Sequence, residues 1–322
     1  MVPAANPEFP DPIGFFLVPK YSMIAFTSAI EPLRSANRMS GSNLYSWRLF
    51  SKDGGPVAAS NGVSLLPDAA ISQSDGFPTM IVCAGNDVHL YRDKEVLSWL
   101  RRLARQGVRL GALCTGSHIL ARAGLLNGHR CTLHWENIPG FIEEFPDIEV
   151  TAELFEIDPT RLTCSGGTAP LDMMLHMISV QHGAKLATAV SDQFTHDRIR
   201  GPDEGQRMTL PSRLGVRNEK LIAAVARMED NVEELLSRHD IAAGVGLSTR
   251  QLERLFHTHL GSTPKRYYLE IRLHRARQLL YHSGLSVLGV ALACGFVSGS
   301  HFAKCYREHF GPAPKNERSL AA

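Results

Sequence analysis

The stretch that decides the architecture is IAAGVGLSTRQLERLFHTHLGSTP, residues 241–264, which returns as VALACGFVSGSHFAKCYREHFGPAP, residues 290–314. The apolar, glycine and proline positions from Leu252 to Pro264 recur 50 residues later, from Phe302 to Pro314. In each copy, a small residue and then a glycine precede this segment. A small residue lets two helices cross closely, and a glycine permits the tight turn between them. The repeat therefore predicts two helix-turn-helix units.

The sequence between and around the two copies is helical in character. Ser248 and Ser298 are placed to cap the second helix of each unit. Residues 264–280 predict a long helix, which can hold two recognition helices about one DNA turn apart. Its basic residues either contact phosphates or form a solvated face: Lys265, Arg266, Arg272, Arg275 and Arg277. No strand pattern follows Asn218, so we expect an all-α domain over residues 218–322.

Charge is distributed unevenly along the chain. From Arg217 to the end we count 15 basic and 10 acidic residues, whereas the whole chain has 34 basic and 32 acidic residues. A mildly acidic first part and a basic second part are consistent with nucleic-acid binding by the second part. Chance unevenness is the alternative.

The two repeated stretches closely resemble the arabinose-regulator (AraC) family of transcription factors, over about a third of the chain. The resemblance implies a regulator that binds double-stranded operator DNA sequence-specifically, and we expect an activator that contacts RNA polymerase. Arginine pairs with guanine and glutamate with the cytosine amino group in the major groove, with a phosphate contact or no contact as the alternatives. The predicted DNA-contacting residues are Arg250, Glu253, Arg254, Ser300, His301, Lys304, Lys265 and Arg307.

The first two hundred residues alternate between strand-like and helix-like segments. Residues 13–18 predict a buried strand, and residues 22–37 predict a helix that Ser22 caps and Pro32 interrupts. Such alternation indicates an α/β fold with a mostly parallel sheet, a flavodoxin-like sandwich. Further strands are predicted at 47–51, 79–83, 108–113, 130–133, 149–154 and 162–164, and further helices at 93–106, 115–123, 169–182 and 185–194.

A charged stretch rich in glycine and proline, residues 196–215, is the best candidate for a linker. We therefore predict a sensor domain over residues 1–197, a linker over 198–217 and a DNA-binding domain over 218–322. The chain has no apolar run long enough to span a membrane. Its start also lacks the features of a signal peptide, so we expect a cytoplasmic protein. The six cysteines form no C-x-x-C pair, and we expect neither a metal nor another cofactor.

The segment LGALCTGSHILARAGL, residues 110–125, predicts a strand, a sharp turn at Cys114 and a helix. This nucleophile-elbow pattern places a side chain at the carboxyl edge of the sheet, where ligands bind in open α/β folds. The start of the following helix favours a thiolate.

The surrounding residues, 13–193, resemble the class I glutamine-amidotransferase-like fold in its PfpI peptidase-like branch. That resemblance implies that Cys114 is the elbow residue and that a carboxylate of the first helix, Glu31, lies near the thiol. Active members have histidine directly after the cysteine, whereas this chain has Thr115. His118 and His134 are the remaining candidates for a base. We therefore expect a ligand-binding site. A cysteine-dependent hydrolase or amidase and a thiol-based redox or aldehyde sensor stay open as alternatives.

The two domains together resemble a subgroup of AraC-type regulators that sense glycine betaine, carnitine or arginine. Residues 16–38 (FLVPKYSMIAFTSAIEPLRSANR) and 51–65 (SKDGGPVAASNGVSL) carry this resemblance. It implies a small-molecule effector and a homodimer. Glu31 would pair with a cationic head, and Trp135 or Trp47 would face a quaternary ammonium. A structural salt bridge is the alternative for Glu31, and core packing is the alternative for Trp47. The predicted ligand-binding residues are Glu31, Cys114, Thr115, His134, Trp135, Cys83 and Gly85.

Overall fold

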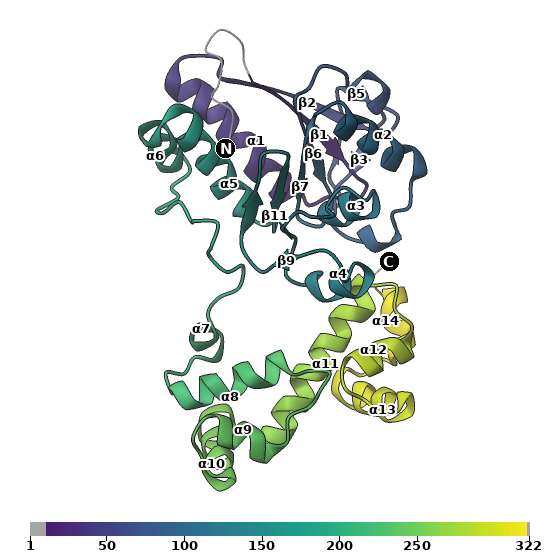
Figure 1. The fold of residues 1–322 in the computed structure, drawn as a ribbon, viewed down its shortest axis with the longest axis vertical. Helices are drawn as coiled ribbons and strands as arrows, with labels where there is room; N and C mark the ends of the chain where they lie inside the picture. The colour runs from purple at the N-terminus through teal and green to yellow at the C-terminus, as the bar shows by residue number, and fades with distance from the viewer. Residues whose placement is uncertain (1–10, 321–322) are drawn as a thin grey trace. The chain divides into compact units, whose positions relative to one another are not determined.

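The computed structural model describes residues 11–320, without the side chains of residues 318–320, and divides into two compact units (Figure 1). The division falls between Gln206 and Arg207, inside the predicted linker 198–217. Residues 1–10 of the predicted sensor domain lie outside the described residues. In the described part of the chain, no helix is long and apolar enough to cross a membrane.

A seven-stranded sheet forms the centre of the first unit, with the strand order β10-β11-β7-β6-β1-β2-β5. Every neighbouring pair is parallel except β10 with β11, which confirms the predicted mostly parallel sheet. Strands buried on both faces are apolar throughout, which is why β6 reads TMIVC. The strands are β1 (Asp11–Leu17), β2 (Tyr45–Ser51), β5 (Ala69–Ala70), β6 (Thr79–Cys83), β7 (Arg109–Leu113), β10 (Phe155–Ile157) and β11 (Arg161–Cys164).

Helices cover both faces of this sheet and make a three-layer sandwich (Figure 1). On β1, Phe15 contributes to the core under one helical layer and Phe16 to the core under the other, because strand side chains alternate between faces. The first layer contains α1 (Met23–Ser40), α5 (Ala169–His182) and α6 (Ala184–Gln193). The second contains α2 (Lys94–Arg105), α3 (Ser117–Arg122) and α4 (Ile138–Glu144).

Several elements differ from the prediction. Helix α1 continues through Pro32, which is buried, and Ser22 caps the helix as expected. The packing of α1 against α5 and α6 outweighs the single hydrogen bond that a proline removes. The predicted strand 149–154 shrinks to β9 (Val150–Thr151), because it pairs only with β8 (Cys131–Thr132) in a separate two-stranded sheet. Strand β10, helix α4 and the pair β3 (Val57–Ala58) with β4 (Ser64–Leu65) were not predicted.

The end of the first unit is fastened to the sandwich by a buried carboxylate. Asp172, in the first turn of α5, is fully buried and accepts hydrogen bonds from His196 Nε2 at 2.8 Å and Arg200 Nη2 at 2.6 Å. The Gln206 side-chain amide donates to the Leu133 carbonyl at 2.9 Å. The first half of the predicted linker therefore belongs structurally to the sensor fold.

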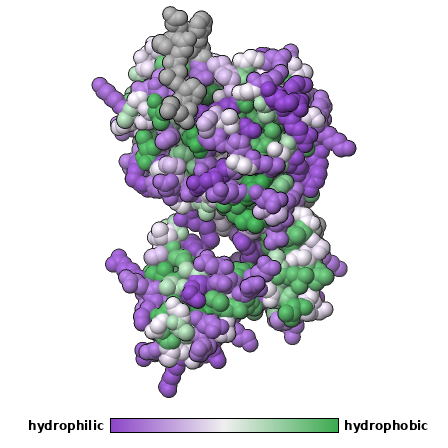
Figure 2. Space-filling view, in the orientation of Figure 1, coloured by the Kyte–Doolittle hydropathy of each residue, from purple (hydrophilic) through white to green (hydrophobic). Residues whose placement is uncertain are grey.

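The second unit consists entirely of helices in its described residues, as predicted. It has one apolar core around each helix-turn-helix unit, and α11 contributes to both. Apolar areas interrupt the mainly hydrophilic surface of the protein (Figure 2). The helices are α7 (Leu210–Leu214), α8 (Glu219–Asp230), α9 (Arg238–Gly244), α10 (Thr249–Leu260), α11 (Pro264–His282), α12 (Val287–Ala293), α13 (Gly299–Phe310) and α14 (Pro314–Leu320).

Candidate DNA interface and sensor site

The first helix-turn-helix unit is formed by α9 and α10. Gly246 turns the chain between them with a φ of 64°, a conformation that glycine adopts without steric cost. Ser248 caps α10, and the Gln251 side chain bonds back to the Ser248 amide in a capping box. Leu252 and Phe256 bury the inner face of α10, which leaves its outer face exposed to solvent.

The second helix-turn-helix unit repeats this construction with α12 and α13. Gly295 makes the turn with a φ of 69°, and the Ser298 side chain accepts a hydrogen bond from the His301 amide. Phe302 and Tyr306 bury the inner face of α13. Both predicted serine caps are confirmed, and the recurring apolar positions are the residues that hold each recognition helix in place.

The loop between α8 and α9 packs against both helix-turn-helix units. Val232 is buried in the core of the second helix-turn-helix unit, whereas Leu236 packs against the core of the first helix-turn-helix unit. A Cβ atom on Gly295 would lie 2.7 Å from the Val232 carbonyl oxygen, so only glycine fits against this loop. The Tyr268 hydroxyl of α11 donates to the Asn231 carbonyl oxygen. The two recognition helices are therefore parts of one compact unit.

The cations of α11 do not share one role. Arg272 donates through Nε to the Cys294 carbonyl oxygen at 2.8 Å, and its guanidinium carbon lies 3.9 Å from the centre of the Phe296 ring. Arg277 forms an ion pair of 2.8 Å with the buried Glu317 carboxylate. Both cations are therefore paired within the helical unit, and the Arg277 side chain is still 40% exposed. Lys265 is exposed, as a phosphate contact requires.

The predicted base-reading residues are exposed on the outer faces of α10 and α13. Glu253 forms an ion pair with Arg238 of α9, a partner that the sequence reasoning missed. Lys304 lies 3.9 Å from Glu308 on its own helix. Arg307 is exposed one turn further along α13. A hollow of about 960 Å³ follows α10 and is lined by Ser248, Arg250, Gln251, Glu253, Arg254, His257 and Thr263.

The sensor site begins with a sharp turn at Cys114, directly after β7. Cys114 has a φ of 57°, the left-handed conformation that is uncommon for residues other than glycine. Its amide donates to the Cys164 carbonyl oxygen at 2.9 Å. A Cβ atom on Gly166 would lie 2.8 Å from Cys114 Cβ, so the loop after β11 packs directly on the elbow. The backbone therefore forms the sharp turn of the predicted nucleophile elbow.

The thiol of this elbow is not activated. Burial raises the pKa of the Cys114 thiol to about 12, and hydrogen bonds from the Thr115 backbone and the Ser22 side chain offset only part of the rise. The Thr115 hydroxyl donates to the Gly85 carbonyl oxygen at 2.7 Å. The residue in the position of the hydrolytic histidine therefore serves to join two loops of the sheet edge.

Glu31 does not lie where we expected it. Its carboxylate is 43% exposed and pairs with Arg34 at 2.7 Å on the same helix. Ser22, at the start of α1, is the residue that contacts the thiol, and Glu31 lies about 13 Å further along the helix axis. The prediction failed because it took the carboxylate from the middle of the helix, whereas the cap lies at the sheet edge.

The two histidines considered as bases differ in position. The His118 ring is fully buried, and its centroid lies 5.1 Å from that of Phe141 and 5.6 Å from that of Phe145, in the layer under α4. His134 lies beside the elbow, since its amide donates to the Cys114 carbonyl oxygen at 3.2 Å. Burial lowers the pKa of His134, and the nearby Glu136 carboxylate opposes this shift.

The remaining predicted ligand residues lie near this edge. Cys83 ends β6 and is buried, and it interacts electrostatically with Cys114. The rings of Trp135 and His134 lie 5.8 Å apart. Around Cys114 the structure thus gathers Cys83, Gly85, Thr115, His134 and Trp135. Glu31 is separated from them.

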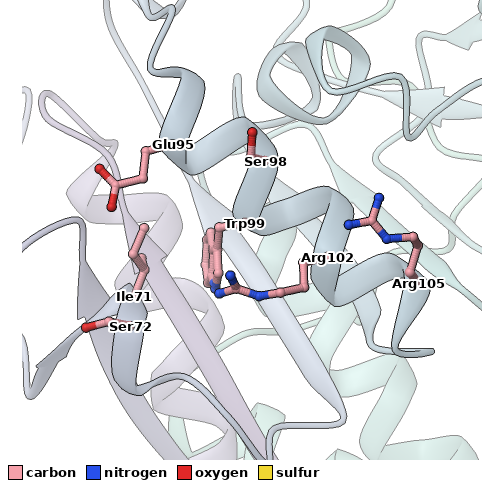
Figure 3. A pocket seen from close by; sticks show the side chains of 7 residues that line it. All are labelled: Ile71, Ser72, Glu95, Ser98, Trp99, Arg102 and Arg105. Carbon is pink, nitrogen blue, oxygen red and sulfur yellow. The ribbon is translucent and has the colours of Figure 1, made fainter.

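Two hollows of the first unit are not lined by Cys114. One has a volume of about 360 Å³ beside α2, where Arg102 extends toward Trp99 (Figure 3). None of the predicted ligand residues line it. The other, of about 300 Å³, lies after the carboxyl ends of β1 and β6. Its Lys20 and Asp87 were missed, although charged residues after neighbouring buried strands are a recognisable signal for a site.

Comparison with known proteins identifies both units. A family model described as a helix-turn-helix domain matches residues 241–319, and one described as the DJ-1/PfpI family matches residues 15–180. A solved structure of an AraC family transcriptional regulator from Pseudomonas putida has a TM-score of 0.53 and 26% identity, and the match covers 57% of this chain and all of that one.

Relatives extend over nearly the whole chain. The chain is 47% identical over 317 residues to the HTH-type transcriptional regulator GbdR of Pseudomonas aeruginosa, covering 98% of this chain and 86% of that protein. It is 46% identical over 306 residues to the regulator CdhR of the same species, covering 95% and 91%. The chain therefore belongs to the AraC-type DNA-binding transcription regulators that carry a DJ-1/PfpI sensor domain.

Proposed function

We propose that this regulator is an activator whose first unit binds a small nitrogen-containing metabolite such as glycine betaine, carnitine or arginine. The observation that carries the binding role is the closed elbow, since the Cys114 thiol is buried and protonated at neutral pH. A thiol must be deprotonated to act as a nucleophile. Thr115 supplies no base, since an alcohol is not basic, and its hydroxyl donates to the Gly85 carbonyl oxygen.

The contacts at the end of the sensor unit support communication between this edge and the DNA-binding unit. Arg200 donates to Thr168 Oγ1 at 2.9 Å, close in sequence to the Gly166 that packs on Cys114. Gln206 bonds the carbonyl of Leu133, the residue directly before His134. A ligand that moves either loop therefore changes the contacts that hold the segment leading to residue 207. The ligand can change the free-energy difference between two arrangements of the protein by no more than its difference in binding free energy for them.

On DNA, we propose that Arg250, Arg254, Ser300, His301 and Lys304 contact bases. Glu253 joins them once its ion pair with Arg238 opens, and Lys265 and Arg307 contact phosphates. The regulator acts as a homodimer, with the sensor in the unit that ends at Gln206 and the DNA-binding domain in the unit that begins at Arg207, so that two copies meet a two-fold operator. Activation then requires contact with RNA polymerase.

A thermal-melt panel of the full chain tests the effector class. The compounds are glycine betaine, carnitine, arginine, choline and unrelated metabolites. A ligand that binds only the native state at 100 times its dissociation constant stabilises it by about 2.7 kcal/mol. Selective stabilisation by one nitrogenous compound is expected. An unchanged melting temperature with every compound contradicts the proposed effector class.

The Cys114→Ala variant separates this function from the thiol-based alternatives. We expect the variant to respond to its effector as the natural protein does, because a protonated thiol contributes no charge. Loss of the response, together with sulfenic acid formation in the natural protein, favours a redox sensor. Turnover of amides or esters that disappears in the variant favours a hydrolase.

A further inference from the structure

The 300 Å³ hollow at the carboxyl edge of the sheet has walls from two loops. One loop, residues 18–20, follows β1, and the other, residues 84–91, follows β6. The volume corresponds to about ten water molecules at ~30 Å³ each, which suits a small metabolite. In open α/β sheets this edge is where ligands bind. The hollow is distinct from the buried thiol, since Cys114 does not line it.

Two opposite charges in the lining of this hollow form an ion pair. Lys20 Nζ lies 2.6 Å from Asp87 Oδ2, and the side chains are 47% and 24% exposed. Both residues have a positive φ, 62° for Lys20 and 59° for Asp87, which is uncommon for residues with a side chain. Two adjacent loops each hold a strained residue, and the two residues carry the pair of charges.

The rest of the lining is apolar or aromatic. Val18 and Val88 are buried, the Tyr91 ring is partly covered, and Leu90 is 68% exposed on the rim. Methylated ammonium groups favour such surroundings, because they are weakly hydrated cations that contact aromatic rings and apolar walls well. A carboxylate in the same molecule would require a cation, and Lys20 supplies one.

The hollow is also joined to the elbow. Arg122 of α3, the helix that follows Cys114, donates to the Tyr91 carbonyl oxygen at 2.6 Å and to that of Val88 at 3.1 Å. The Thr115 hydroxyl holds the Gly85 carbonyl oxygen of the same loop. A ligand that moves residues 84–91 therefore acts on the elbow helix without contact with the thiol.

We propose that this hollow binds a small zwitterion by exchanging the Lys20–Asp87 ion pair for two pairs with the ligand. The ligand carboxylate pairs with Lys20, and its ammonium group lies against Asp87 and Tyr91. The inference rests on the proposed effector function and gives that function a location. An exposed ion pair contributes little to folding, so its opening costs little.

Three isosteric probes test the proposal by titration calorimetry on the full chain. Glycine betaine has both charges, choline has only the cation, and 3,3-dimethylbutyrate has only the carboxylate. Asp87→Asn should weaken glycine betaine binding at least tenfold and leave 3,3-dimethylbutyrate unchanged. Lys20→Gln should weaken glycine betaine binding at least tenfold and leave choline unchanged. A melting curve of each variant without ligand checks that it folds.

The matched control is Lys52→Gln. Lys52 Nζ lies 2.6 Å from Asp93 Oδ2, with exposures of 47% and 21%, so the same chemistry occurs outside the hollow. This variant should bind glycine betaine like the natural protein. Natural affinity for glycine betaine in both Lys20→Gln and Asp87→Asn overturns the proposed site and leaves the effector class standing. A natural protein that binds none of the zwitterions in the panel overturns both.

Discussion

Replacing Arg272 by alanine should weaken the folding of the DNA-binding unit without removing a DNA contact. The substitution removes a hydrogen bond from a charged donor to the Cys294 carbonyl oxygen and a guanidinium stacked on Phe296. The hydrogen bond is worth about 2 kcal/mol and the stacking about 1 kcal/mol. The expected loss of about 3 kcal/mol lowers the melting temperature of a unit of this size by roughly 10 °C.

Calorimetry of the full chain measures this transition, and duplex DNA of random sequence measures the electrostatics. A phosphate contact contributes about 0.9 to the slope of log K against log salt concentration. Lys265→Ala is the matched variant, since Lys265 is exposed on the same helix. This variant should make the negative slope shallower by about 0.9 and leave the melting temperature unchanged. If Arg272→Ala makes the slope shallower and leaves melting unchanged, the inward assignment of Arg272 is refuted.

Three further predictions concern the elbow and the recognition helix. Gly166→Ala should cost about 2 kcal/mol more than Gly167→Ala in urea unfolding: both have positive φ, but only Gly166 meets Cys114, and equal losses contradict this packing. Since burial raises the thiol pKa of Cys114 from 9.0 to about 12, its contribution to stability should be complete below pH 9 and decline from pH 9 to 12. The decline should be smaller in Cys114→Ala, and alkylation of this thiol with a midpoint below pH 9 would disprove the assignment. Arg254→Ala should cost about 1–3 kcal/mol on an operator selected with the natural protein and less on random DNA, and equal losses on both exclude base reading.

The sequence was sufficient to predict features that depend on local pattern. The 50-residue repeat predicts two recognition helices because their buried positions and caps are set within each unit. Apolar runs such as residues 79–83 predict the central strands because a strand covered on both faces contains few polar residues. Each of these signals depends on neighbours a few positions away.

Features that depend on contacts between distant residues were not predictable in the same way. The basic side chains of α11 look equivalent in sequence, yet Arg272 faces inward because a carbonyl and a ring of the second unit lie within its reach. Glu31 has the right chemistry for the sensor site, but its place on α1 puts it away from the sheet edge. Lys20 and Asp87 are 67 positions apart and meet only through the parallel pairing of β1 with β6.

The loop that joins the two helix-turn-helix units has a consequence for how operators of this regulator evolve. Because Gly295 and Val232 pack the recognition helices against one loop, we expect the protein not to follow a change in the phase of the site that both helices are proposed to contact. One inserted base pair moves the second half of the site by 3.4 Å and turns it by about 34°. A point change should cost one contact, whereas an insertion between the halves should remove all contacts of one helix. Operators of this regulator should therefore drift by substitution and keep their length.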